Sequence, residues 1–371
     1  MKTVAFIRGT DIFNDSRSTK EIRALIEDGY RVEILGWNRG GNALEQCQTT
    51  FSDVLDHVNF SFFHVRAENG IGIRNIHKLL GWIRWIRKKL KALHKQNGIF
   101  AVHACDLDAG IAAKAFCATN KVKLVYDIFD YYIDTHTVPS CLRSLVENME
   151  IKTINAADVT VICTEERKEQ LQKASPKKLI VIHNSPELNE APTEEDVDYC
   201  YCGAMSDMRL ISEILDEYGN HTDLAFLFAG YGPHAKKAVS MAETYENFSF
   251  MGSVPYATVL SSEARARVLS AIYEPTIRNH RLCAPNKFYE ALALGKPIIV
   301  CRGTGIDAIV LEHQIGRVIE YDAKDFYKAL RELSADDELR KEMGKRARCL
   351  YEERYHWKIM KDILLTAYRE L

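Results

Sequence analysis

The stretch that decides the fold is residues 284–301, which read APNKFYEALALGKPIIVC. Pro285 suits the first turn of a helix, Gly295 suits its left-handed end, and Pro297 cannot continue it. The short apolar run that follows, residues 297–301, favours a buried strand. A helix that leads directly into a buried strand is the repeating unit of a parallel α/β sheet.

The same alternation of strands and helices runs through both halves of the chain. In the first half, short apolar strands are expected at residues 4–8, 32–35, 60–65, 101–104, 124–127, 159–163 and 179–183. In the second half they are expected at residues 199–202, 225–229, 248–251, 270–273 and 297–301. Apolar residues at helical spacing separate these runs, so the sequence predicts two doubly wound parallel-sheet domains of Rossmann type.

An acidic segment with two prolines, residues 186–196 (PELNEAPTEED), is typical of a linker between such domains. We therefore expect an N-terminal domain at residues 1–185 and a C-terminal domain at 197–354. An amphipathic helix at residues 357–371 is expected to add to the N-terminal domain. Sheets of this kind bind ligands beyond the carboxyl ends of their strands, here in the cleft between the domains.

Length and composition exclude several classes of protein. The 371 residues are too many for one hydrophobic core, and 27% charged residues are ordinary for a globular chain. No apolar run approaches the ~20 residues that span a bilayer. Arg8 and Asp11 interrupt the N-terminus before a signal peptide could form, so we expect a cytoplasmic protein. The ten cysteines are isolated except for Cys200 and Cys202, which favours free thiols over disulfides or a zinc site.

The sharpest site signal lies at the start of the helix quoted above. Lys287 and Glu290 are three residues apart and therefore neighbours on the helix surface. A helix N-terminus attracts anions, and Lys287 adds a full positive charge that fits a phosphate. The cation Arg278 precedes it, and the glycines at 230 and 232 follow a strand, where they would let the backbone approach a nucleotide. The alternative is an ordinary helix with a surface Lys–Glu pair.

These residues resemble a known family. The string P-N-K-x-x-E-A-x-A-x-G-x-P at 285–297, with G-x-G-P at 230–233, is similar to the nucleotide-sugar site of GT-B glycosyltransferases, and most closely to glycosyltransferase family 4. The likeness continues in order along the chain. It includes an acceptor loop at 13–17 (FNDSR), a middle-strand motif at 103–106 (HACD), Asn184 before the linker, and the start of a terminal crossover helix at 355–357 (YHW).

The resemblance implies a GT-B fold and a role for each matching residue. Glu290 would bind the ribose hydroxyls, and Lys287 with Arg209 would neutralise the departing diphosphate. The other implied donor-binding residues are Gly203, Gly230, Gly232, Tyr273, Arg278 and Asn286, and the implied acceptor-binding residues are Asn14, Asp15 and Arg17. No metal and no other cofactor is implied. Asp106 and Asp108 form a D-x-D pattern, but two carboxylates alone underspecify a cation site.

Two departures from the family pattern concern the reaction centre. The family usually has Glu-x7-Glu ending at the position of Glu290, whereas this chain has Leu282 at the first position. Where relatives have His-Glu, this chain has Phe129-Asp130, which is similar to the inverting glucuronosyltransferase of xanthan assembly. An inverting enzyme needs a general base, for which Asp130 is the first candidate, Asp127 the second and Asp15 the third. The alternative is that Asp130 caps a turn.

A basic amphipathic helix at residues 75–96 suggests where the acceptor lies. Its polar surface has seven cations and no acid, and Trp82 and Trp85 stand beside them. This pattern is typical of a helix on anionic lipid, with Trp82, Trp85, Arg87, Lys88 and Lys89 as the expected contacts. The alternative is a helix packed on the sheet with a solvated basic face. Nothing else in the sequence accompanies it to indicate nucleic acid.

The sequence thus predicts a glycosyltransferase that moves a sugar from a nucleoside diphosphate sugar, expected to be a UDP-sugar, to a hydroxyl of a membrane-associated or lipid-linked glycan precursor. The expected setting is cell-surface polysaccharide assembly at the inner face of the membrane. Two alternatives stay open. One is an epimerase of similar fold that acts on nucleotide sugars, and the other is a non-catalytic nucleotide-sugar-binding partner of a larger complex.

Overall fold

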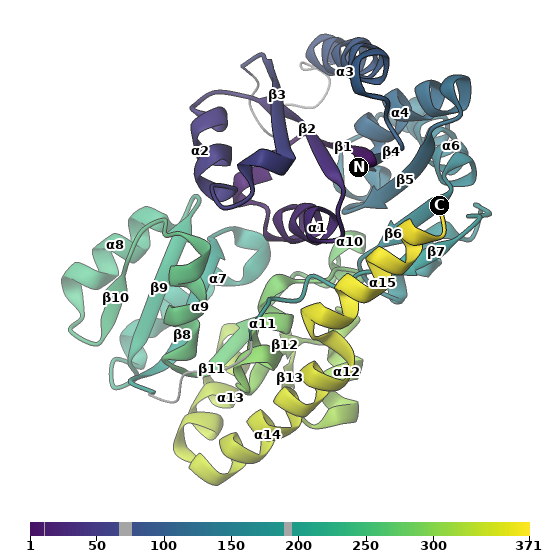
Figure 1. Cartoon of the computed structure of the whole chain (residues 1–371). Helices are drawn as coiled ribbons and strands as arrows, with labels where there is room; N and C mark the ends of the chain where they lie inside the picture. Colours follow the sequence, from purple (N-terminus) through teal and green to yellow (C-terminus); the bar gives the residue numbers. More distant parts are fainter. Residues whose placement is uncertain (11, 67–75, 189–194) are drawn as a thin grey trace. The chain divides into compact units, whose positions relative to one another are not determined.

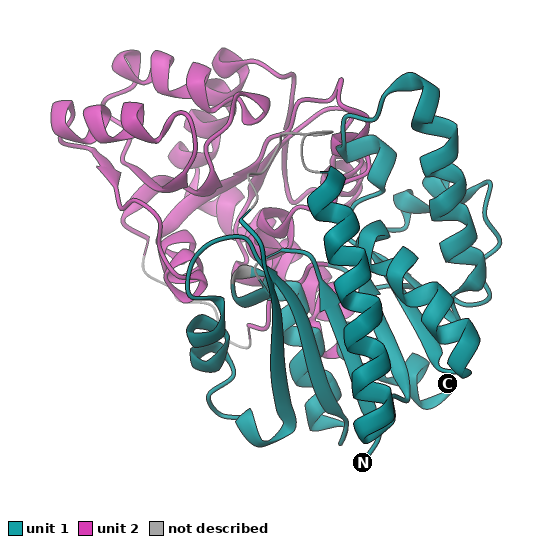
Figure 2. Ribbon diagram, turned by 90° about the horizontal axis from the view of Figure 1, so that it is seen from above, with its two compact units in different colours: residues 1–183, 360–371 teal, residues 184–359 magenta. Residues whose placement is uncertain are grey.

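The computed structural model describes residues 1–10, 12–66, 76–188 and 195–371 (Figure 1). The chain forms two compact units, and each is described here by itself (Figure 2). The first unit is Met1–His183 with Met360–Leu371, and the second is Asn184–Ile359. The first unit thus ends two residues before the expected boundary at 185. Part of the expected linker, residues 189–194, lies outside the described residues.

The first unit is built on a seven-stranded sheet with the order β3-β2-β1-β4-β5-β6-β7, in which neighbouring strands run parallel. Its strands are β1 (Thr3–Arg8), β2 (Arg31–Asn38), β3 (Val58–His64), β4 (Ala101–Cys105), β5 (Lys123–Ile128), β6 (Val159–Ile162) and β7 (Leu179–Val181). The chain order reverses between β1 and β4. In doubly wound sheets the carboxyl ends of two such strands flank the ligand crevice.

The α-helices of the first unit are α1 (Ser16–Glu27), α2 (Ala43–Thr50), α3 (Ile76–Asn97), α4 (Asp106–Asn120), α5 (Tyr132–Thr135), α6 (Ser140–Ala156) and most of α15 (Trp357–Arg369). Asp15 starts α1 because its side chain accepts hydrogen bonds from the backbone N–H groups of Arg17 and Ser18. Apolar residues of α3 and α4, such as Leu90 and Ala112, pack in one core cluster with strand residues of the sheet.

The second unit is built on a six-stranded parallel sheet with the order β10-β9-β8-β11-β12-β13. Its strands are β8 (Val197–Ala204), β9 (Phe226–Tyr231), β10 (Phe248–Phe250), β11 (Ala266–Ala271), β12 (Ile298–Cys301) and β13 (Gly316–Ile319). Its α-helices are α7 (Ile211–Glu217), α8 (Ala235–Thr244), α9 (Tyr256–Ala264), α10 (Arg278–Arg281), α11 (Asn286–Leu294), α12 (Ile306–His313), α13 (Ala323–Ala335) and α14 (Asp337–Leu350). The order reverses between β8 and β11, so the ligand crevice of this sheet is expected there.

The helix that decided the sequence prediction is α11. Pro285 immediately precedes it, and Gly295 ends it in the left-handed conformation with φ of 64°. The strand β12 follows three residues later, as predicted. The segment from residue 284 to residue 301 therefore forms the helix–strand unit that the sequence indicated.

The C-terminal helix α15 returns to the first unit, as predicted for a crossover helix. The hydroxyl of Tyr368 lies 2.8 Å from Nδ1 of His103 in β4. Lys361 forms an ion pair with Glu27, and Arg369 forms one with Asp28, both at the end of α1. The helix thus covers the face of the sheet on which α1 lies (Figure 1).

The basic helix α3 corrects one sequence expectation. Trp82 is fully buried, and its Nε1–H donates to Asp108 Oδ2 at 2.8 Å, so its assignment as a membrane anchor was wrong. Trp85 is half-buried and stacks on Trp82 with ring centroids 5.4 Å apart. Lys89 is half-buried, while Arg87 and Lys88 are exposed. Among the described residues, no helix combines the length and the apolar character that a membrane span needs.

Candidate functional site

The donor residues expected in the second unit gather where β8 and β9 end and α11 begins. Gly203, the last residue but one of β8, lies beside Lys287, and a Cβ atom added to Gly203 would lie 3.1 Å from the Lys287 ammonium. Gly232 has φ of 129°, and an added Cβ would lie 2.7 Å from the carbonyl oxygen of Met205. Gly230 has φ of 148°, and a Cβ atom added to it would overlap the carbonyl oxygen of Gly203. These glycines permit the close approach of the two strand ends.

The ammonium group of Lys287 is held in a mostly buried position. Its side chain is 12% exposed, and Nζ lies 3.8 Å from Oε1 of Glu263 in α9. Nζ also lies 4.8 Å from the centroid of the Tyr201 ring in β8. Burial disfavours the charged form, but Glu263, Tyr201, Glu290 and Cys202 together outweigh it and raise the pKa of Lys287 above its ordinary value. Lys287 therefore stays cationic.

A second cation, Arg209, lies near Lys287, and each of the two cations stands over an aromatic ring. The Arg209 guanidinium stands 4.9 Å from the centroid of the Tyr273 ring. The Tyr201 hydroxyl donates to the carbonyl oxygen of Ala204 at 2.6 Å and lies near enough to Arg209 to interact with it electrostatically. Tyr201 thus lies near both Arg209 and Lys287. Two cations positioned on rigid elements suit a diphosphate.

Glu290 is 2% exposed and projects from the second turn of α11 among other polar groups. Tyr256, the first residue of α9, lies near it: burial and then the charge of Glu290 raise the pKa of the Tyr256 hydroxyl. Arg278 and Asn286, also expected in the donor site, are exposed. The structure therefore brings Lys287, Glu290 and Gly203 together and adds Glu263, Tyr201 and Tyr256. These three carry no motif in the sequence.

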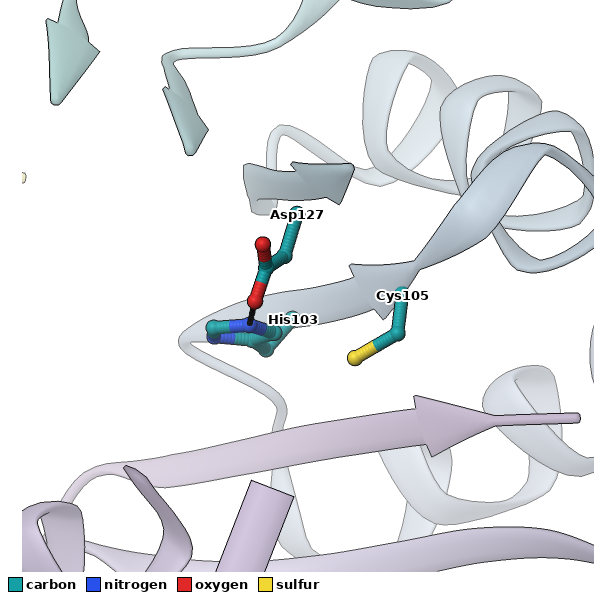
Figure 3. Close-up of side chains that lie close together, drawn as sticks. All are labelled: His103, Cys105 and Asp127. Carbon is teal, nitrogen blue, oxygen red and sulfur yellow. Dashed lines mark hydrogen bonds and ion pairs between the residues drawn. The ribbon is translucent and has the colours of Figure 1, made fainter. Parts of the chain in front are cut away.

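In the first unit, the second candidate base, Asp127, is sealed inside the protein. Its side chain has no exposed area and forms an ion pair of 2.5 Å with Arg17. His103 Nε2 lies 3.4 Å from its other carboxylate oxygen (Figure 3). Burial raises the pKa of Asp127, although Arg17 opposes this. A carboxylate that is enclosed and paired in this way suits a structural role.

Arg17 also lies inside this cluster. It is 3% exposed and donates to Glu21 Oε1 at 3.0 Å in addition to Asp127. Its guanidinium already pairs with two buried carboxyl groups, so we no longer regard Arg17 as an acceptor-binding residue. Asp15 caps α1 and pairs with Arg8 at 3.0 Å. The side chain of Asn14 lies outside the described residues.

The buried cluster of Arg17, Glu21, His103, Cys105 and Asp127 has ligand atoms of the types that bind metals. One ligand atom each from His103, Cys105 and Asp127 lies within 4.8 Å of the others (Figure 3). Burial raises the pKa of the Cys105 thiol well above its ordinary value, and Arg17 already pairs with Asp127. A protonated thiol is a poor ligand, and the guanidinium occupies the place of a cation. The donor set does not fit a metal ion.

Asp130, the first candidate base, differs from Asp127 in being accessible. Its side chain is 50% exposed and lies 3.0 Å from a guanidinium nitrogen of Arg167. The backbone N–H groups of Phe129 and Asp130 both donate to Oδ1 of Asp106, at 3.1 and 3.3 Å. These bonds fix the turn after β5 and present the Asp130 carboxylate at the surface of the first unit.

Comparison with known proteins was made against family models, curated sequences and solved structures. Residues 189–349 match the family model described as Glycosyl transferases group 1. A search of curated protein sequences finds no match. The chain is similar to sucrose-phosphate synthase from Thermosynechococcus elongatus, with a TM-score of 0.72 and 15% identity over 100% of this chain and 99% of that chain.

Two further solved structures are similar over the same extent. HepE of Anabaena in complex with UDP-glucose has a TM-score of 0.71 and 11% identity, with 100% of both chains covered. A glycosyltransferase from Rickettsia africae has a TM-score of 0.68 and 13% identity, with 100% of this chain and 98% of that chain covered. At these identities the likeness concerns the fold. The chain has the GT-B fold, with two Rossmann-like parallel-sheet domains, as the sequence predicted.

The buried cluster predicts a defined dependence of stability on pH. Burial and the neighbouring Asp127 raise the pKa of Glu21 from 4.5 to about 7. The folded state thus holds this proton more tightly than the unfolded chain, so Glu21 contributes stability in full below pH 4.5, and this contribution is lost as the pH rises through about 7. His103 acts with the opposite sign, because burial lowers its pKa from 6.5 to about 4.

In Glu21→Gln the contribution of Glu21 is absent. Between about pH 5 and about pH 7.5, the wild type should therefore lose on the order of 2 kcal/mol of unfolding free energy relative to this variant. Guanidinium unfolding followed by tryptophan fluorescence measures this, with the exposed Glu45→Gln as control. A difference between wild type and Glu21→Gln that stays constant with pH contradicts the assignment.

Proposed function

We propose that the chain is a glycosyltransferase that uses a nucleoside diphosphate sugar, a UDP-sugar, as donor. The observation that carries the proposal is the buried, charged Lys287 beside Gly203 at the N-terminus of α11. A helix N-terminus and a fixed ammonium together favour a diphosphate over other ligands. The match of residues 189–349 to the glycosyl transferases group 1 model supports glycosyl transfer, and the UDP-glucose bound to HepE supports the class of donor.

In this proposal the second unit binds the donor. Lys287 and Arg209 neutralise the negative charge that develops on the diphosphate as the bond to the sugar breaks, and Glu290 accepts hydrogen bonds from the ribose hydroxyls. Because two cations stabilise the leaving group, the reaction as proposed uses no metal ion and no other cofactor.

The first unit is proposed to bind the acceptor, with Asp130 as general base for an inverting transfer. Its accessible carboxylate would take the proton from the acceptor hydroxyl as that oxygen attacks the anomeric carbon. Asp127 cannot serve in the same way, since it has no exposed area and is paired with Arg17. Asp15 is engaged as the cap of α1.

The acceptor is proposed to be a membrane-associated glycan precursor of cell-surface polysaccharide assembly. The support is the stripe on α3 made by Arg84, Lys88, Lys91 and Lys95, which are exposed and share one helix face. The half-buried Trp85 adds little, so the attraction to anionic lipid is mainly electrostatic. At ~1 kcal/mol per cation, such a stripe holds a protein at an anionic surface.

The donor site is tested by replacing its two central side chains. Lys287→Ala and Glu290→Ala should each weaken binding of UDP and UDP-sugars by about 10- to 100-fold, because each removes a charge-assisted hydrogen bond. Isothermal titration measures the dissociation constants. The exposed Lys341→Ala should bind as the wild type does. Wild-type affinity in both site variants would overturn the site assignment.

The proposed base is tested by Asp130→Asn. This change should lower turnover by about 10²- to 10⁴-fold and leave the affinity for UDP-sugar unchanged, since the donor binds to the other unit. Rates of sugar transfer to a lipid-linked acceptor measure it. Asp56→Asn, also exposed, serves as the control. Full turnover in Asp130→Asn would exclude its role as base.

The cationic stripe on α3 is tested with lipid vesicles. The triple variant Arg84→Gln, Lys88→Gln, Lys91→Gln should bind phosphatidylserine-containing vesicles roughly 100-fold more weakly than the wild type, from ~1 kcal/mol per cation. A matched variant with Lys324, Lys328 and Lys341 of the second unit changed to Gln, all exposed, should bind normally. Equal losses in the two variants would mean non-specific attraction, and no loss would exclude the stripe.

A further inference from the structure

Glu263 is a buried carboxyl that no motif accounts for. It lies in the last turn of α9 and is 2% exposed. Its Oε1 is 3.8 Å from the Lys287 ammonium, and its carboxyl group lies near enough to that of Glu290 for the two to interact electrostatically. The other titratable groups facing it are the thiols of Cys200 and Cys202 in β8 and the hydroxyl of Tyr256 in α9.

Two carboxyl groups therefore lie beside one ammonium in a mostly buried site. Glu263 Oε2 is buried, and no hydrogen-bond donor among the described residues faces it. Two adjacent carboxylates cannot both stay ionised in such a place, so one of them holds a proton. Burial, followed by the charge of Glu290, raises the pKa of Glu263 well above its ordinary value. The proton thus belongs on Glu263.

This arrangement lets one residue, Glu263, position both Lys287 and Glu290. A carboxylic acid can donate its proton to Glu290 and present its second oxygen to Lys287 at the same time. Without it, Lys287 and Glu290, three residues apart on α11, would pair with each other. Leu282, which stands where related enzymes have a glutamate, is 7% exposed and apolar. The second carboxyl of this site thus comes from a different element.

We propose that Glu263 is a positioning residue of the donor site, whose carboxylic acid proton is shared with Glu290 and whose other oxygen holds Lys287, so that the two meet the ribose and the diphosphate of the donor. This inference rests on the proposed function. Gln at position 263 keeps one donor and one acceptor in the same places, whereas Leu keeps the volume and removes both.

The test compares Glu263→Gln and Glu263→Leu by titration with UDP. Glu263→Gln should bind UDP within about 2-fold of the wild type, and Glu263→Leu about 10-fold more weakly or worse, as for the loss of one charge-assisted hydrogen bond. In the wild type, the affinity for UDP should fall at alkaline pH as Glu263 loses its proton. This fall, the alkaline limb of the pH profile, should be absent in Glu263→Gln. A role confined to stability would lower the melting temperature without changing the pH profile.

The outcomes separate this inference from the proposed function. If Lys287→Ala and Glu290→Ala weaken UDP binding while Glu263→Leu binds normally, the positioning role is wrong and the donor site stands. If none of the three changes UDP binding, the donor site itself is wrong. Should Glu263→Leu fail to fold, the pH profile of Glu263→Gln decides, and an unchanged alkaline limb overturns the proposal. The exposed Glu243→Gln is the control.

Discussion

A charged ammonium that is withdrawn from water needs an opposite charge beside it, and the site in the second unit depends on how Lys287 meets this need. An isolated buried charge would lose its proton rather than persist. The carboxyl pair of Glu263, 3.8 Å away, and Glu290, which shares one proton, supplies the compensating negative charge, and the face of the Tyr201 ring lines the other side. The missing side chain of Gly203 leaves the space that the ammonium occupies. Three elements, β8, α9 and α11, thus fix one positive charge at a helix N-terminus.

The first unit compensates its buried charges in a different way. Its buried groups have a structural role, which distinguishes them from an accessible group that could react. There a guanidinium, Arg17, lies between two carboxyl groups, Glu21 and Asp127, and His103 connects them to Tyr368 of the C-terminal helix. The cluster therefore joins α1, the centre of the sheet and α15. A group enclosed in this way supports the fold, and the accessible Asp130 is the acid that we propose to meet the substrate.

Both the fold and the grouping of Lys287 with Glu290 in the candidate donor site could be anticipated because their signals are local. The alternation of apolar strands and helices needs no knowledge of distant contacts, and Lys287 and Glu290 lie on one helix whose ends are marked by Pro285 and Gly295. Glu263 could not be found in this way, since it belongs to another helix and no spacing connects it to α11. The same holds for Tyr201, which lies on β8 beside Lys287 and carries no motif that connects it to α11.

The errors of the sequence analysis have one physical cause. Trp82 stood beside a cationic face and was expected at a membrane, but its indole N–H finds a partner in Asp108, which is 26 residues away in another helix. Arg17 was expected at an acceptor, but its charge is compensated by Asp127, which is 110 residues away. A polar group can be buried only when a partner is present, and the partner is supplied by the fold rather than by the neighbouring sequence.

The most direct test of this account is a crystal structure of the protein with a UDP-sugar bound. The account predicts that a diphosphate oxygen lies within hydrogen-bond distance of Lys287 Nζ, and that the ribose hydroxyls donate to the carboxylate of Glu290. A nucleotide bound elsewhere, or a diphosphate that Lys287 does not touch, would contradict it.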